Sequence, residues 1–438
     1  MSRTGTYSAE NPVSRQFHRL FTAQNLTRLV LIMCMLFCSG GIFLLLGKGT
    51  SMVDPDSESA QSSNRAMWLA AYPLILAALF TGWRVLASAL NNQLIIVLML
   101  ALSLVSALWS HSAGGTVFAT IQLAITTLFA VYAPRALGYR NFLETMGWSF
   151  VIMIGLSLVF AVALPHYGFV QDTQNAGSLR GIFPQKNTLA TYMTLAIPTV
   201  SLLAFSSIGY MRLMWAGTAG LALIMLLMTK SATALLLVLA MPFLVWFTLS
   251  IARSRANGLF VVGLTIFGFG ALAAAIYILG PLILEALGKD AGLSGRDSLW
   301  ATILASFTTR PLFGFGFFGF WTDTSEFGGA RITSGVVWHP TSTHNAWLNM
   351  AIQLGVPGLL LMIALWVTGF MRSGRLIFLV GSPLAAWPFV VLIVMTTWSL
   401  VQSNFMNHQS VLHMYVIFAV TAATEGVRNA HVLRPVRL

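Results

Sequence analysis

The chain has 438 residues, of which 57% are hydrophobic and only 8% are charged. Soluble domains carry roughly a quarter charged residues, so this composition excludes the soluble globular classes and predicts an all-α polytopic membrane protein. The net charge of +12 would favour nucleic-acid binding in a soluble protein. In a membrane protein, the distribution of the excess Lys and Arg residues indicates which loops stay in the cytoplasm.

Apolar stretches predict about twelve transmembrane helices, because roughly 20 apolar residues cross a bilayer. Residues 1–25 form a polar, basic tail without the features of a signal peptide, and residues 426–438 form a second tail. Between them we expect helices over 26–283, a long loop at 284–343 that contains short helices, and further helices over 344–425. The predicted spans are 26–46, 66–82, 93–109, 117–134, 146–165, 188–207, 213–229, 231–251, 258–283, 344–371, 383–401 and 411–425.

The arginines predict the orientation of these spans. An even number of spans puts both tails on one side, and the loops of that side hold most of the Lys and Arg with few acids. Positively charged loops stay in the cytoplasm, so both tails are predicted to be cytoplasmic. The long polar segments 47–65, 165–187 and 284–343 then face outward, where chemistry is to be sought.

The segment 165–187 carries basic residues directly before a predicted span. Arg180, Lys186 and Asn187 lie where the free N–H groups of a helix N-terminus favour an anion. They are either an anion cradle or positive residues that happen to flank a membrane helix. The positive-inside rule does not account for basic residues on the outer face, so their presence there favours a functional role.

The long loop begins with an expected amphipathic helix. Ser294-Gly-Arg296-Asp297 has the form of an N-terminal capping box, which puts Arg296 in the first turn. There Arg296 is either an anion-binding residue or an ordinary surface arginine. The predicted apolar stripe of this helix is Leu299, Trp300, Ile303, Leu304 and Phe307.

Glycines alternate with aromatic residues from Arg310 to Trp321. The run is too apolar for a free loop and too rich in glycine for a spanning helix, which favours an interfacial or re-entrant segment. It would either line a groove for a lipid chain or serve packing.

The loop ends with His339-Pro-Thr-Ser-Thr-His344-Asn345, directly before a span. Ser342 or Thr343 is expected to cap that helix, which leaves His344 in its first turn. An imidazole titrates near neutrality, so His344 is either a general base or an ordinary residue of the membrane interface.

No residue pattern supports a metal site. The remaining histidines are scattered, and Asp54-Pro-Asp56 reads as an exposed acidic loop rather than a cation site. Cys34 and Cys38 lie one helical turn apart inside the first span, which indicates packing.

With these residues in place, the segment 292–358 resembles the O-antigen ligase and polysaccharide polymerase superfamily. The signature of that family is His-Asn, nine residues, then Gly-x-x-Gly, and His344-Asn345 followed by Gly355-Val-Pro-Gly358 matches it in full. The runs SGRDSLW, RPLFGFG, Leu108-Trp109-Ser110 and RGIFPQKN at 180–187 are also similar to the family. Lys186-Asn187 resembles the exopolysaccharide-polymerase branch, whereas residues 323–338 match no part of the family pattern.

The resemblance implies a C-type glycosyltransferase-like fold in the bacterial inner membrane, with the active site facing the periplasm. It implies an inverting transfer without metal or cofactor, from an undecaprenyl-diphosphate-linked glycan to an acceptor hydroxyl. It assigns the essential histidine to His344 and two arginines to Arg296 and Arg180. We further expect Lys186, Asn187, Asn345 and Arg310 to contact substrate.

The expected mechanism follows from those assignments. Guanidinium groups bind phosphate in bidentate fashion, so the two arginines would stabilise the leaving diphosphate, and His344 would take the proton of the acceptor hydroxyl. The acceptor is either a lipid-linked repeat unit, as in a polymerase, or lipid A–core, as in a ligase. A lipid-linked oligosaccharide flippase is an alternative from another class. It is disfavoured because such transporters place ionisable residues inside their spans, whereas the predicted spans of this chain carry essentially none. A purely structural membrane subunit is a further alternative.

Overall fold

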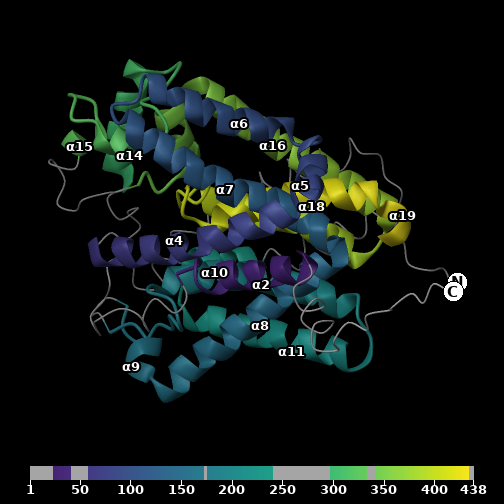
Figure 1. Cartoon of the computed structure of the whole chain (residues 1–438). Coiled ribbons are helices and arrows are strands. Elements are labelled where there is room, and N and C mark those ends of the chain that lie inside the picture. Colours follow the sequence, from purple (N-terminus) through teal and green to yellow (C-terminus); the bar gives the residue numbers. More distant parts are fainter. Residues whose placement is uncertain (1–22, 41–57, 172–174, 240–295, 333–341, 434–438) are drawn as a thin grey trace, which may run out of the picture.

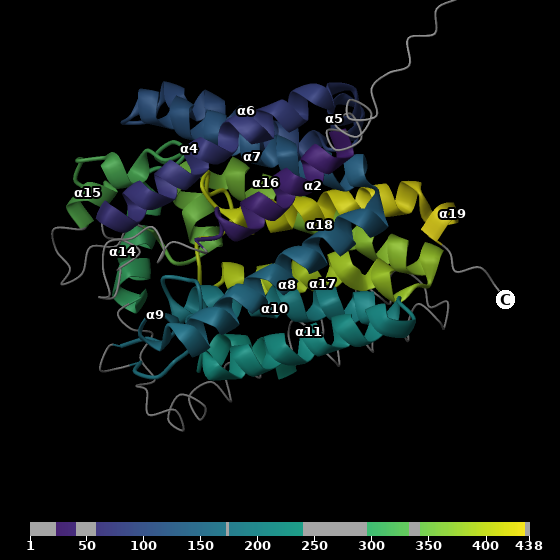
Figure 2. The same ribbon diagram turned by 60° about the horizontal axis from the view of Figure 1, so that its bottom comes forward.

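The computed structural model describes residues 23–40, 58–171, 175–239, 296–332 and 342–433. Within these ranges the protein is helical, and its long helices lie side by side in roughly one direction (Figures 1 and 2). The longer helices are α2 (Ala23–Leu36), α4 (Glu58–Thr81), α5 (Trp83–Leu90), α6 (Leu94–Val105), α7 (Ala113–Leu137), α8 (Tyr139–Ala163), α10 (Lys186–Phe205), α11 (Gly209–Met228), α14 (Arg296–Thr309), α16 (Ala346–Val380), α17 (Trp387–Ser399) and α18 (Val411–Arg428). The short ones are α9 (Pro165–Gly168), α15 (Gly329–Ile332), α19 (Ala430–Leu433) and the 3₁₀ helices η1 (Ser106–Leu108), η2 (Phe320–Thr322) and η4 (Pro383–Ala386).

This bundle is that of a polytopic membrane protein, as the composition predicts. Among the described residues, five helices are long and apolar enough to cross a membrane, or up to six if the bent pair α4–α5 is one span. Further apolar helices, at Ala23–Leu36, Leu94–Leu108 and Pro383–Ser399, are shorter. The expected span at 258–283, most of the one at 231–251, the last residues of the one at 26–46 and the first part of the long loop lie outside the described residues. All the other predicted spans coincide with a described helix, and the total of about twelve stays a prediction.

The boundaries of several predicted spans are wrong: α2 ends at Leu36 rather than near residue 46, and α8 begins at Tyr139 rather than near residue 146. Helix α4 begins well before residue 66, and at Gly82 the chain bends by 84° into α5. The Tyr132 ring occupies the space that a Cβ at Gly82 would need, so the bend accommodates only glycine at this position. Helix α16 continues past residue 371 to Val380, because the Arg372 side chain is held there by Gln93, Thr424 and the carbonyl of Asn92.

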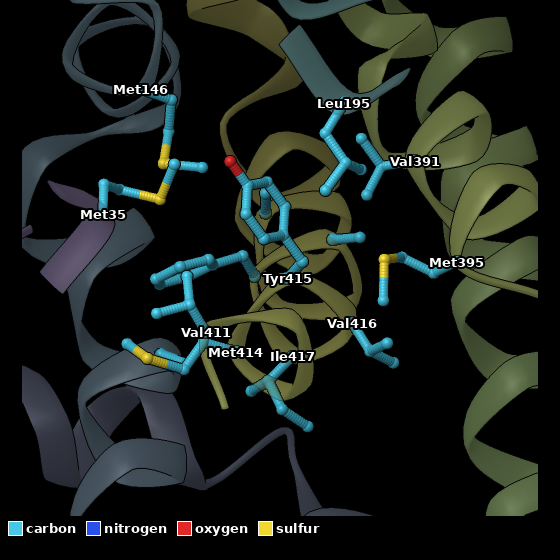
Figure 3. Packing of buried hydrophobic residues seen from close by; sticks show 14 of the residues in the cluster. Met35, Met146, Leu195, Val391, Met395, Val411, Met414, Tyr415, Val416 and Ile417 are labelled. Carbon is cyan, nitrogen blue, oxygen red and sulfur yellow. The ribbon is translucent and has the colours of Figure 1, made fainter. Parts of the chain in front are cut away.

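The core is built around α18, which packs against α7, α16 and α17. Figure 3 shows side chains from other helices closing around it, with Met35 of α2, Met146 of α8, Leu195 of α10 and Met395 of α17 near Tyr415. Helices pack this tightly in a membrane through close van der Waals contact and through hydrogen bonds between helices.

Such hydrogen bonds fix α17 against α10. The indole N–H groups of Trp387 and Trp398 donate to the hydroxyl groups of Thr199 and Thr194, each over 2.9 Å. On the outside of the bundle α11 leaves many apolar side chains uncovered, such as Leu213, which is 72% exposed, as expected of a helix that faces lipid.

The two ends of the bundle differ. Helices α9, α14 and α15 lie at one end in both views, and α19 lies at the other (Figures 1 and 2). We call these the α14 end and the α19 end. Near the α19 end, Arg135 pairs with Glu425 over 2.7 Å, with Arg428 4.0 Å from the same carboxylate. The residues that the sequence singled out lie at the α14 end.

Candidate functional site

The N-terminus of α16 carries the histidine of the signature. Asn345, not Ser342 or Thr343, is the N-cap: its side-chain oxygen accepts from the N–H groups of Trp347 and Leu348. His344 therefore precedes the helix instead of standing in its first turn, and it adopts a positive φ of 50°. The expected cap was wrong because Asn at this position reaches two free helix N–H groups while its backbone stays extended.

Further hydrogen bonds hold Asn345 in place, among them one from the Thr343 hydroxyl to the Asn345 carbonyl over 2.6 Å. Its Nδ2 donates to the carbonyl of Leu400 over 3.2 Å, and its backbone N–H lies within 3.3 Å of the hydroxyl oxygens of Thr343 and Ser403. The Thr343 and Ser403 hydroxyls are themselves 2.8 Å apart. The backbone on one side of His344 is thus fixed, which holds a residue in a conformation that non-glycine residues seldom adopt.

Helix α14 is attached to the other side of His344. The Trp300 indole donates to the carbonyl of Thr343 over 2.9 Å, and a small core joins Leu299 and Ile303 to Ile352 of α16. The predicted apolar stripe of α14 is confirmed except for Leu304, which is 48% exposed. Arg296 is the first residue of α14 and precedes Trp300 by about one helical turn. Because Trp300 bonds to Thr343, the start of α14 lies close to the segment that carries His344. The Arg296 side chain, Ser294 and His339 lie outside the described part.

The second half of the signature makes a break in α16. Gly355 has φ 66° and ψ −161°, a conformation in which only glycine is comfortable, and a Cβ there would meet the carbonyl of Leu312. The break leaves backbone groups without helical partners, and the segment after α14 supplies them. Phe315 N–H donates to Ile352 O and Gly316 N–H to Gln353 O, both over 2.9 Å.

The glycine–aromatic run 311–318 is therefore a docked segment that packs against the kink of α16. The Phe318 N–H donates to the Gln353 side chain over 2.7 Å, and the Phe317 N–H to the Ser106 hydroxyl over 2.9 Å. The Trp109 indole donates to the carbonyl of Phe313 over 3.0 Å. Three motifs that are far apart in the sequence, at 108–110, 311–318 and 344–358, meet in one structure, and packing is the role that this geometry gives the run.

Arg310 lies beside a buried carboxylate. Its Nη1 is 3.7 Å from Asp323, its guanidinium lies over the Phe315 ring at 4.5 Å, and 44% of its side chain stays exposed. The same Asp323 carboxylate accepts from the Ser325 N–H over 2.8 Å and has His111 at 3.9 Å. Asp323 thus fixes the turn after η2 and orients Arg310 toward the α14 end.

Arg180 is buried in the loop between α9 and α10. Its side chain is 1% exposed, its Nε donates to the carbonyl of Tyr167 over 2.8 Å, and its Nη2 has no hydrogen-bond partner within the described chain. Burial lowers the pKa of the Arg180 guanidinium, which nevertheless keeps its charge at neutral pH. A buried, charged donor without an acceptor is costly, and an anionic ligand would satisfy it.

Lys186 and Asn187 open helix α10. Lys186 is its first residue and is 8% exposed, whereas Asn187 is exposed and its carbonyl accepts from the Thr191 hydroxyl. Both follow Arg180 closely in the sequence, at the start of the helix. Lys186 is far more buried than a residue that merely flanks a membrane helix.

The structure joins these residues in two groups at the α14 end. In the first group, α14 links His344 and Asn345 at the N-terminus of α16 to Arg310, which lies beside the segment docked at the kink. Arg180, Lys186 and Asn187 form the second group at the start of α10. Helix α17 connects the two groups, since its Trp398 bonds to α10 and Leu400, which follows it, bonds to Asn345.

Sequence reasoning missed the loop 400–410 between α17 and α18. Besides Ser403, it carries His408, whose ring lies 4.9 Å from the Phe318 ring and whose carbonyl accepts from the Tyr72 hydroxyl over 3.5 Å. Burial, together with the charge of Arg65, lowers the pKa of His408 to about 4, so this imidazole is neutral at physiological pH. The available signal was a polar loop between two spans on the predicted outer face.

Among the described residues, no three His, Cys, Asp or Glu side chains gather as metal ligands would. The charged groups at the α14 end are instead mainly cationic, which suits a substrate that carries phosphate.

Comparison with known proteins agrees with this geometry. Residues 217–363 match the family model described as O-antigen ligase. The "Exopolysaccharide production protein ExoQ" of Rhizobium meliloti (strain 1021) is 28% identical over 319 residues, which cover 69% of this chain and 70% of that protein. The resemblance to the O-antigen ligase and polymerase superfamily is therefore confirmed, and the matched region contains Arg296, Arg310, His344 and the kink at Gly355.

Proposed function

We propose that this protein is a membrane glycosyltransferase that polymerises exopolysaccharide repeat units at the periplasmic face of the inner membrane. The donor is a glycan linked to undecaprenyl diphosphate, and the acceptor is a sugar hydroxyl of a second lipid-linked unit. The family match supports the class of reaction, and the name of the rhizobial relative favours exopolysaccharide as the product.

One observation carries the proposal: the guanidinium of Arg180 is buried, and its Nη2 has no hydrogen-bond partner among the residues that the structure describes. A diphosphate supplies acceptor oxygens of matching charge, and negative charge grows on it as the glycosidic bond breaks. A charge-assisted hydrogen bond from a preorganised donor therefore stabilises the transition state more than the ground state. Arg296 adds a second cation from the first turn of α14, and Lys186 lies near the diphosphate.

His344 is the proposed general base. It takes the proton of the acceptor hydroxyl while the hydroxyl oxygen attacks the anomeric carbon, and the bond from that carbon to the diphosphate oxygen breaks on the opposite face. In-line attack inverts the anomeric centre. The clamp of Asn345 by Thr343, Ser403 and Leu400 supports this role, because a base must be held within hydrogen-bond reach of its proton. Asn187 and Arg310 are proposed to contact the glycan.

The test compares Arg180→Lys with Arg140→Lys in vesicles supplied with lipid-linked donor. Lysine keeps the charge of Arg180 but loses the planar fork, so we expect polymer formation to fall by about 10²-fold or more. Arg140 is an exposed arginine near the start of α8 that pairs with Glu144, so its replacement should leave polymer formation unchanged. Polymer formation by Arg180→Lys at the rate of the control variant would refute the diphosphate role.

The ligase reaction is the second candidate, because the matching family model carries that description. It differs only in acceptor, which would be lipid A–core. Deletion of the gene separates the two reactions: a polymerase predicts loss of secreted polymer with intact lipopolysaccharide, whereas a ligase predicts repeat units that are no longer attached to lipid A.

A further inference from the structure

An apolar groove lies between α2 and α4, apart from the residues that the proposed chemistry uses. Its volume is about 430 Å³, and one wall includes Met33 of α2 together with Phe37 and Cys38, which directly follow that helix. Its α4 wall includes the small residues Ala66 and Ala70, so the two helices leave room between them without offering a charged side chain. Such a lining suits a flexible hydrocarbon and offers nothing to a sugar or a nucleotide.

One end of this groove leads to the Arg180 loop. Cys38 is followed by Ser39, whose side chain hydrogen-bonds to Tyr192 of α10, and by Gly40. A Cβ at Gly40 would be 3.8 Å from the Pro184 ring. Pro184 belongs to the same short turn as Arg180, in which the Phe183 N–H donates to the Arg180 carbonyl over 3.1 Å. The groove thus ends at the stretch of chain that begins with Arg180, whose Nη2 has no hydrogen-bond partner among the described residues.

We propose that the α2–α4 groove receives the diphosphate-proximal part of the polyprenyl tail of the donor; this inference rests on the function proposed above. A ligand that fills the groove and also satisfies Arg180 must join a hydrocarbon chain directly to an anionic group, and a polyprenyl diphosphate has this form. A diacyl phospholipid carries two chains on a glycerol and fits a single groove beside one buried cation less well.

The groove orients the donor more than it attracts it. The bilayer is as apolar as the groove, so moving the tail from one to the other gains little from the hydrophobic effect. What the groove supplies is position: a tail held between α2 and α4 presents its diphosphate at the Arg180 turn, and alignment of the reacting groups is itself a large catalytic term.

The test fills the groove with a bulky side chain and compares tail lengths. Ala70→Trp blocks the α4 wall, and Ala77→Trp is the matched control, because Ala77 is an exposed alanine of the same helix outside the groove. For a long-tailed donor we expect Ala70→Trp to reduce kcat/KM about tenfold, which corresponds to about 1.4 kcal/mol. For a donor with a tail of two isoprene units it should change little, and Ala77→Trp should affect neither donor. Equal losses for both tail lengths would overturn the proposal.

A binding measurement separates this proposal from the catalytic one. The full-length protein in vesicles is irradiated with a polyprenyl phosphate that carries a benzophenone in its tail and no glycan, and labelled residues are identified by mass spectrometry. We expect labelling of Met33 and its neighbours that Ala70→Trp abolishes and that unlabelled polyprenyl phosphate, but not phosphatidylglycerol, competes away. Labelling without any polymer formation would leave the groove assignment standing and remove the proposed function. Equal competition by phosphatidylglycerol would identify an ordinary lipid site and overturn the groove assignment.

Discussion

Replacing Gly355 by alanine tests the geometry on which the site depends. Gly355 has φ 66° and ψ −161°, and an alanine in this conformation raises the free energy of the folded state by about 1–3 kcal/mol through backbone strain. Its Cβ would also meet the carbonyl group of Leu312, so the docked segment 311–318 must move away. Movement breaks the bonds from Phe315 N–H to Ile352 O and from Gly316 N–H to Gln353 O, each worth about 1 kcal/mol.

These terms add up to about 4 kcal/mol of lost docking free energy, which is about a thousandfold change in the local opening equilibrium. The assay is amide hydrogen exchange of Phe315 and Gly316 in detergent, followed by mass spectrometry, with polymer formation measured on the same samples. We expect exchange at these amides to accelerate by about a thousandfold, and polymer formation to be lost while the bundle stays folded.

Gly381→Ala is the matched control. Gly381 ends the same helix at φ 65°, but nothing lies within 4 Å of the position of its missing Cβ. It therefore carries the backbone strain, about 1 kcal/mol, without the clash. Unchanged exchange at Phe315 and Gly316 in Gly355→Ala, or a response equal to that of Gly381→Ala, would refute the docking role of the kink.

Two further predictions concern His408 and Asn345. Because the pKa of His408 is lowered to about 4 in the folded protein and lies near 6.5 when unfolded, the unfolded chain binds more protons, so stability should fall as pH drops from about 6.5 toward 4. His408→Gln should flatten that part of the pH profile of the melting temperature, and an unchanged slope would contradict the assignment. Asn345→Asp keeps the oxygen that caps α16 but loses the donor to Leu400, whereas Asn345→Ala loses both and should destabilise the helix start by about 1 kcal/mol. If capping is the main role of Asn345, Asp should retain most polymer formation and Ala should not; equal loss in both variants would point instead to a substrate contact of its amide.

Much of the fold could be predicted from composition and periodicity alone. Runs of apolar residues give the spans because the bilayer leaves the backbone no other way to satisfy its hydrogen bonds. Helix ends were harder to predict: α16 passes residue 371 because Arg372 finds partners on neighbouring helices, and no local pattern announces such partners.

For the candidate site, the chain sequence by itself determined which residue types stand at which spacing: the His344-Asn345 pair, the glycines of the signature, the arginine before α10 and the glycine–aromatic run. Only the tertiary structure decided what they do to one another. It made Asn345 the cap, turned the run 311–318 into the partner of a kinked helix, and brought the unnoticed loop 400–410 to Asn345. It also buried Arg180, whose Nη2 has no partner among the described residues. The physical reason is that hydrogen-bond partners and burial are set by contacts between segments far apart in the chain, whereas helix formation in a membrane is set by the local run of apolar residues.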